Sequence, residues 1–147
     1  MVRFTDMFTE LVRIEIELWN GLDTHLLSKT GLSLPQFQAL TAIRVKGHGA
    51  RVQDISDEMS ITVGATSKVV DRLERDGLAL RSANPSDRRS SLVRLTPRGS
   101  TALALADDVV ETHLRGVLGS TLPDNQVSTL VEALAAIRVH VPEQVTK

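Results

Sequence analysis

The residues most suited to contact another molecule lie in a charged cluster at positions 87–89. Asp87 precedes two arginines, Arg88 and Arg89. A carboxylate beside two guanidinium groups can pair with one and leave the other directed outward, and a planar guanidinium suits a phosphate or a narrow groove. Taken alone, the cluster fits the solvated end of a surface hairpin equally well, so its meaning depends on the elements that carry it.

The segment before this cluster predicts a helix from Thr62 to about Gly77. Thr62 can act as its N-cap, and Gly77 can adopt the left-handed conformation that ends a helix. Residues at helical spacing form one stripe that can face a core: Thr66, Val69, Val70 and Leu73. The opposite face is small or polar, so it can approach another surface closely, and it carries Gly64, Ser67, Lys68 and Asp71, flanked by Arg72 and Arg75.

Residues 78–95 predict a β-hairpin, because the apolar period changes from that of a helix to strict alternation. Val93 and Leu95 share one face of the second strand, and Leu92 and Arg94 share the other. The segment 84–87 (Asn-Pro-Ser-Asp) is dense in turn-forming residues. The charged cluster therefore sits at the tip of this hairpin.

A short helix from about Gln53 to Ser60 precedes the helix that begins near Thr62. Their apolar spacing is typical of a helix-turn-helix, in which the second helix is directed at a DNA major groove. Such motifs commonly have alanine where Ser56 stands and glycine where Ser60 stands. Both serines are small, so a tight crossing of the two helices is preserved.

The succession of a helix-turn-helix, GLALR and NPSDRRSSLVRLTPRG resembles the winged helix of the MarR family of bacterial transcription regulators. The wing pattern is the most specific part, and it is present as Asp87, Arg89, Leu95, Thr96 and Gly99. By motif the resemblance covers roughly residues 30–100. Outside that segment it extends only to the pattern of helices.

The resemblance implies sequence-specific binding of double-stranded DNA. Arg89 matches the wing arginine that enters the minor groove, and Asp87 matches the carboxylate that orients it. Val63 and Gly64 cannot hydrogen-bond to bases through their side chains, which leaves the operator sequence open. The expected DNA contacts are Thr62, Val63, Gly64, Ser67, Lys68, Arg72, Arg88, Arg89 and Arg94.

The expected fold is mainly α with a small β-wing, in one domain spanning residues 1–147. Residues 33–99 would form the winged helix-turn-helix, and residues 1–31 and 100–147 would form helices for dimerisation. The first and last helices carry more apolar surface than a compact winged helix can cover, so we expect them to pair with a second copy. A homodimer of this kind predicts a pseudo-palindromic operator.

Composition limits the alternatives. The net charge is −1, but residues 62–98 carry eight cations and four carboxylates, so this segment is +4 and the remainder −5. A basic module on an acidic body suits localised contact with phosphates. The chain lacks cysteine and any long apolar run, so we expect a cytoplasmic protein without disulfides or a membrane partner.

We expect no enzymatic activity, cofactor or metal site. The pairs Glu15/Glu17 and Asp107/Asp108 occupy alternate or adjacent helical positions, so their carboxylates diverge instead of flanking a substrate. No triad-like motif accompanies the serines and histidines. The four histidines also lack the paired spacing of metal ligands.

The resemblance further implies a pocket for a small, often anionic aromatic effector that weakens DNA binding. Trp19 is the first candidate to line it, although a tryptophan at this place can instead fill the dimer interface. His25 and Arg44 are further candidates. Trp19, Asp71 and Arg94 are loosely reminiscent of the residues used by the urate-sensing branch of the family.

Two functions from different classes follow. The first is a DNA-binding regulator, expected to be a repressor that is released by a ligand. The alternative is a winged-helix protein-interaction module without DNA affinity. The hairpin tip separates them, because an interaction module has no need for a carboxylate and two arginines together.

Overall fold

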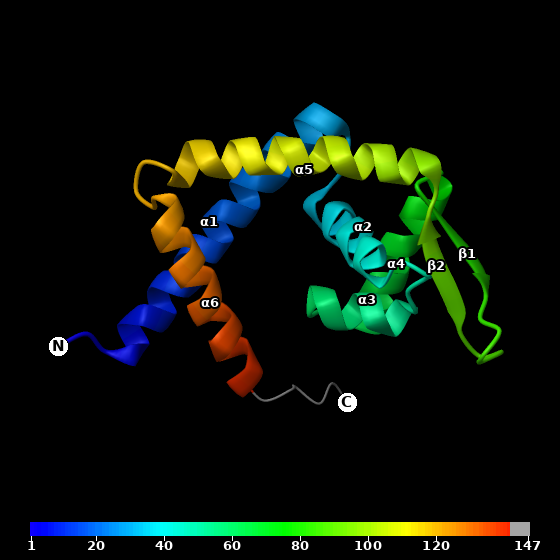
Figure 1. The fold of residues 1–147 in the computed structure, drawn as a ribbon, viewed down its shortest axis with the longest axis horizontal. Coiled ribbons are helices and arrows are strands. Elements are labelled where there is room, and N and C mark those ends of the chain that lie inside the picture. Colours follow the sequence, from blue (N-terminus) through cyan, green and yellow to red (C-terminus); the bar gives the residue numbers. More distant parts are fainter. Residues whose placement is uncertain (142–147) are drawn as a thin grey trace. The chain divides into compact units, whose positions relative to one another are not determined.

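The computed structural model describes residues 1–141 and shows a mainly helical chain with one small antiparallel sheet (Figure 1). Its elements are α1 (Phe4–Thr30), α2 (Leu34–Lys46), α3 (Val52–Met59), α4 (Val63–Arg75), β1 (Ala79–Ala83), β2 (Ser91–Leu95), α5 (Pro97–Leu118) and α6 (Asp124–His140). The expected fold class is thereby confirmed. The chain divides into two compact units, Met1–Val110 and a second that begins at Glu111.

The boundary between α1 and α2 follows the local chemistry of the sequence. Gly31 ends α1 with a φ of 74°, the left-handed conformation that glycine adopts at little cost. The side chains of Ser33 and Gln36 then form a capping box at the start of α2. Asp23 of α1 adds a second cap, because its Oδ1 accepts a hydrogen bond from the Leu34 N–H at 2.7 Å.

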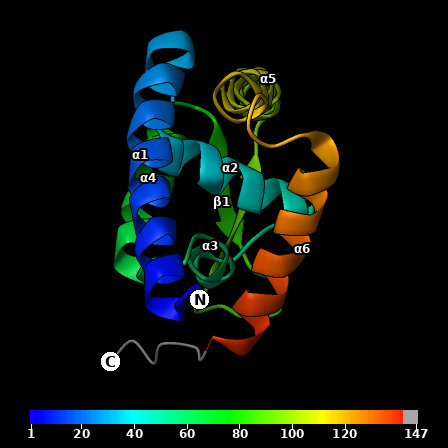
Figure 2. The ribbon, with the colours of Figure 1, turned by 90° about the vertical axis from the view of Figure 1, so that its left-hand side faces the viewer.

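The core of the first unit is formed where α2, α3, α4 and the hairpin meet. In Figure 2, α3 is seen end-on below α2, and the two helices are in contact. The largest side chains that are completely buried come from several elements: Leu26, Leu40, Ile55, Thr66, Val70, Leu73, Val93 and Leu103. All four residues of the predicted α4 stripe are buried, so this helix is held by its apolar face.

The hairpin pairs Ala79 with Leu95 and Ala83 with Ser91, and it extends beyond the neighbouring helices (Figure 1). Ala50, from the loop before α3, adds an antiparallel bridge to Val93 with hydrogen bonds of 2.9 and 2.7 Å. Gly49 allows this close approach: its φ is 123°, and a Cβ there would lie 3.1 Å from Leu92 Cβ.

Helix α5 begins at Pro97. The Thr96 hydroxyl accepts the Gly99 N–H at 2.9 Å and donates to the Gly77 carbonyl at 2.7 Å, which ties the start of α5 to the end of α4. A Cβ at Gly99 would lie 1.9 Å from the Leu78 carbonyl oxygen. Glycine is therefore required at this position of the wing pattern.

Helix α6 begins at Asp124, directly after the N-cap residue Pro123. Its apolar stripe is exposed, with exposed fractions between 40% and 58%, at Val127, Leu130, Val131, Leu134 and Ile137. Across residues 1–141, no helix has the length and apolar character needed to cross a membrane.

Candidate DNA-binding surface

The turn between α3 and α4 fixes how the second helix leaves the first. Ser60 adopts a φ of 54°, in the left-handed region where glycine is commonest. This backbone conformation explains why glycine is common at this position of such motifs. Ser56 is buried, and its hydroxyl donates to the Ile61 carbonyl at 2.6 Å. The two serines thus support the tight crossing expected of a helix-turn-helix.

The first turn of α4 presents the predicted contact residues to solvent. Thr62 caps the helix, since its Oγ1 accepts the Ala65 N–H at 3.1 Å. Val63, Gly64 and Lys68 are exposed, and Ser67 is half-buried. The absence of a large side chain at Gly64 lets this surface approach a groove closely, and the positive end of the helix dipole favours a nearby phosphate.

Arg81 of β1, one of the eight cations in residues 62–98, lies beside this face of α4. Its Nη1 donates to Oδ1 of Asp71 and to Oε2 of Glu74, each at 2.6 Å, and its Nη2 donates to Oγ of Ser67 at 3.3 Å. The Arg81 N–H also donates to Oε1 of Glu74 at 2.9 Å. Arg81 therefore links the wing to one face of α4 through both its guanidinium and its backbone N–H.

The spacing of these partners was a signal available in the sequence. Positions 67, 71 and 74 lie on one helical face, but a spacing within a helix does not identify its partner on a strand. Partial burial acts to lower the pKa of Arg81, and the hydrogen bonds with Asp71 and Glu74 outweigh it, so the pKa is raised. Arg81 therefore stays charged at any physiological pH.

The tip of the hairpin is shaped by short side chains. Oδ1 of Asn84 accepts the Ser86 N–H at 3.0 Å, and Oδ1 of Asp87 accepts the Arg89 N–H at 2.9 Å. Asp87 thus acts on the backbone that carries the arginine, and among residues 1–141 it forms no ion pair with Arg88 or Arg89. The forked carboxylate–guanidinium pair considered from the sequence is not formed in the isolated chain.

Both tip arginines are exposed, as are two further predicted contacts, Arg72 of α4 and Arg94 of β2. Arg94 is partly anchored, because its Nε donates to the His48 carbonyl at 2.8 Å. Its terminal nitrogens form no ion pair within the described chain. The exposed arginines therefore line the wing from its tip to its base.

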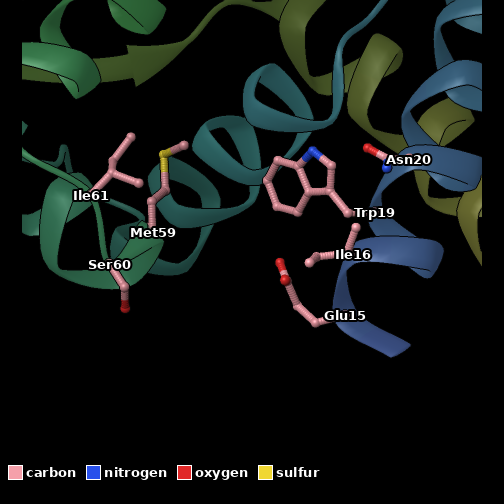
Figure 3. Close-up of a pocket in the computed structure, with 7 residues that line it drawn as sticks. All are labelled: Glu15, Ile16, Trp19, Asn20, Met59, Ser60 and Ile61. Atoms are coloured by element: carbon pink, nitrogen blue, oxygen red, sulfur yellow. The ribbon is translucent and has the colours of Figure 1, made fainter. Parts of the chain in front are cut away.

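A cleft of about 460 Å³ lies between α1 and the turn that joins α3 to α4 (Figure 3). The Trp19 ring and the Met59 side chain point into the space between the two elements. The cleft is lined by Glu15, Ile16, Trp19, Asn20, Met59, Ser60 and Ile61. Trp19 therefore lines a cleft in the single chain, as one of the two interpretations from the sequence required.

The other ligand candidates lie elsewhere. Arg44 pairs with Asp107 of α5, and neither it nor the half-buried His25 is among the residues that line the cleft. Asp71 is held by Arg81, and Arg94 contacts the loop before α3. The set of Trp19, Asp71 and Arg94 is thus not brought together in this cleft.

Within residues 1–141, no three histidine or carboxylate side chains are grouped so that they could hold a metal ion. The fold and the surface define a class of protein: a winged helix-turn-helix with an exposed leading turn on α4 and arginines along its wing.

Comparison with known proteins narrows this class to one family. The sequence model of the MarR family matches residues 32–91. The HTH-type transcriptional regulator MhqR of Bacillus subtilis (strain 168) is 28% identical over 133 residues, which are 89% of this chain and 88% of MhqR.

Two solved structures with bound ligands are also similar. A mutant MarR of Escherichia coli complexed with operator DNA is 26% identical, with a TM-score of 0.74 and coverage of 96% of this chain and 100% of that one. CouR of Rhodococcus jostii RHA1 bound to p-coumaroyl-CoA is 25% identical, with a TM-score of 0.79 and coverage of 90% and 91%. The family model, the curated relative and the solved structures that this chain resembles are all MarR-type transcription regulators.

Proposed function

We propose that this protein is a sequence-specific, double-stranded DNA-binding transcription regulator that acts as a homodimeric repressor. One observation carries the proposal: the leading turn of α4, from Thr62 to Ala65, is exposed together with Lys68, while the opposite face of the same helix is buried. A helix held by its apolar face with a small, polar, capped first turn is suited to enter a major groove. The operator DNA bound by the similar MarR supports the same mode.

The wing supplies the second contact. Arg88 and Arg89 stand at the tip of the hairpin, and arginine is favoured in a narrow minor groove by its width and negative potential. Lys68, Arg72 and Arg94 would contact phosphates, which position the protein without reading the sequence. Because Val63 and Gly64 offer bases only apolar surface, we infer that specificity depends on groove shape and on the wing.

A homodimer places two such surfaces on one duplex. The exposed apolar stripe of α6 and the exposed Phe4 and Phe8 of α1 provide surface for a second copy. Two half-sites about one helical turn apart would then form a pseudo-palindromic operator. Residues 33–99 would bind the DNA, and residues 1–31 and 100–147 would form the dimer.

We further propose that a small effector binds in the cleft beside Trp19 and weakens DNA binding. The cleft reaches Ser60 and Ile61, which immediately precede the N-cap of α4, so a ligand there can shift the helix that reads DNA. The lining residues include Glu15 and no lysine or arginine, so this part of the cleft suits an apolar group better than a carboxylate. A regulator of this kind acts in the cytoplasm, where bacterial DNA is located.

The test is a salt titration of binding to a duplex from immediately upstream of the protein's own gene, against random duplex of equal length. We expect two chains per site, a preference for the upstream duplex, and affinity that falls steeply between roughly 50 and 200 mM salt as counterions are released. Equal binding to both duplexes would contradict sequence specificity for that site. Absence of binding even at low salt would favour the protein-interaction module.

A further inference from the structure

Two carboxylates lie on the recognition helix close to the surface proposed to contact DNA. Asp71 follows Ser67 by one helical turn, and its side chain is 63% exposed. Glu74 lies one turn further on and is 31% exposed. Negative charges at these positions oppose the phosphates of an approaching duplex, and the cost is greatest at low salt.

Arg81 is placed to offset this cost. It reaches both carboxylates and Ser67 from β1, and its own side chain is only 24% exposed. Its donors are thus directed at α4 and not outward, in contrast to the exposed Arg72, Arg88 and Arg89. A forked guanidinium can hold two carboxylates at once, which a lysine ammonium does less well.

We propose that Arg81 is a positioning residue for DNA binding, which compensates Asp71 and Glu74 and holds them on the wing side of α4. Arg81 thereby offsets one of the two negative charges beside the leading turn of α4, which lowers the local repulsion that an approaching duplex meets there. This inference rests on the proposed function. It differs from a direct role, in which Arg81 would itself contact a phosphate.

The test compares the wild type with Arg81→Gln and with the triple variant Asp71→Asn/Glu74→Gln/Arg81→Gln on the upstream duplex. We expect Arg81→Gln to weaken binding by about tenfold at low salt, with a smaller loss at high salt where the repulsion is screened. The triple variant should return to within about threefold of the wild type, because it lacks the carboxylates that needed compensation.

A matched control is Arg115→Gln. Arg115 also pairs with two carboxylates, Glu111 at 2.8 Å and Asp124 at 3.2 Å, but it lies in the second unit. Its substitution removes the same charge and two similar contacts, and we expect wild-type affinity. Thermal unfolding of each variant verifies that it is folded at the temperature of the binding assay.

The outcomes separate this inference from the function on which it rests. Wild-type affinity in Arg81→Gln, or a triple variant as weak as Arg81→Gln, overturns the positioning role while the wild type still binds. A wild type that binds no duplex at low salt overturns the function itself. Should Arg81→Gln fail to fold, Asp71→Asn/Glu74→Gln replaces it: affinity at or above the wild type supports the role, and a loss of affinity overturns it.

Discussion

Helices α4 and α6 carry similar apolar spacings and differ in what covers them. In α4, the stripe that runs from Thr66 to Leu73 is buried within its own chain. In α6, the stripe from Val127 to Ile137 is exposed, with no buried residue in the helix. An exposed apolar stripe of this kind on α6 indicates a surface that contacts another molecule.

The same helical spacing of apolar residues therefore serves two purposes in this chain. The α4 stripe fixes a helix so that its other face can be presented to DNA. The α6 stripe is available for a second copy, and a two-fold interface would bury the same residues from both chains. Substitutions in one stripe and not the other therefore test whether the two stripes differ in what covers them.

The largest effect is expected from Leu130→Asp/Leu134→Asp in α6. Both side chains are about 40% exposed in the single chain, so charge there should prevent dimerisation while the winged helix stays folded. Binding to a two-half-site operator should weaken by about 10² to 10⁴, because the second half-site is no longer held at high effective concentration. Sedimentation gives the oligomeric state, and an operator titration gives the affinity.

The control is Glu132→Lys on the same helix, an exposed residue outside the stripe. It should leave the dimer intact. A variant Leu130→Asp/Leu134→Asp that remains dimeric would show that α6 does not form the interface.

The next effect tests the other stripe. Leu73→Ala leaves a cavity where the side chain is completely buried, and we expect the free energy of unfolding to fall by about 2 to 5 kcal/mol. Circular dichroism during denaturant unfolding measures this loss at matched protein concentrations, since dimerisation adds to apparent stability.

Leu134→Ala in α6 is the matched control for this loss. It removes the same atoms from a side chain that is 40% exposed, so it should cost less in a dilute, monomeric sample. Equal losses for the two variants would contradict the difference in burial on which the comparison rests.

The sequence predicted the elements well because their signals are local. Caps, glycines and periodicity define α1 to α6 and the hairpin, including Ser33 at the start of α2 and Thr96 before α5. The same periodicity could not tell whether a stripe is covered by the same chain or by another. Burial depends on which element packs there, and that is not a local property.

Contacts between distant segments were the part that could not be predicted from spacing. Arg81 pairs across ten and seven residues with Asp71 and Glu74, and Ala50 bridges to Val93. The cleft beside Trp19 likewise joins α1 to a turn some forty residues further along the chain. Ranking Arg81 among eight cations required a structure that shows which partner each one faces.

A smaller effect is expected at the wing. Arg89→Ala should weaken operator binding by about 1 to 3 kcal/mol per half-site, because it removes the proposed minor-groove contact without touching the core. The oligomeric state and the thermal stability should be unchanged, so this variant separates DNA binding from dimerisation. The exposed Arg13 of α1 provides the control, since Arg13→Ala removes the same charge from a residue outside the proposed surface. An unchanged affinity for Arg89→Ala would remove the wing from the proposed mode of binding.

The smallest effect is expected in the pH dependence of the free energy of unfolding, and it arises from an ion pair within the winged helix. Oδ2 of Asp54 accepts the Arg51 N–H at 2.9 Å, and the Arg51 side chain pairs with the same carboxylate at the start of α3. The hydrogen bond with the Arg51 side chain, opposed by partial burial, lowers the pKa of Asp54.

A carboxyl group whose pKa is lower in the folded state stabilises the fold above its unfolded pKa, and this contribution is lost as the pH falls through the folded pKa. Stability of the wild type should therefore decline below about pH 4 more steeply than that of Asp54→Asn, which carries no titrating group there. Thermal melts across the acid range measure the two slopes. Parallel curves for the wild type and Asp54→Asn would mean that this cap is not maintained in solution, and that α3 is held by its buried Ile55 and Ser56 alone.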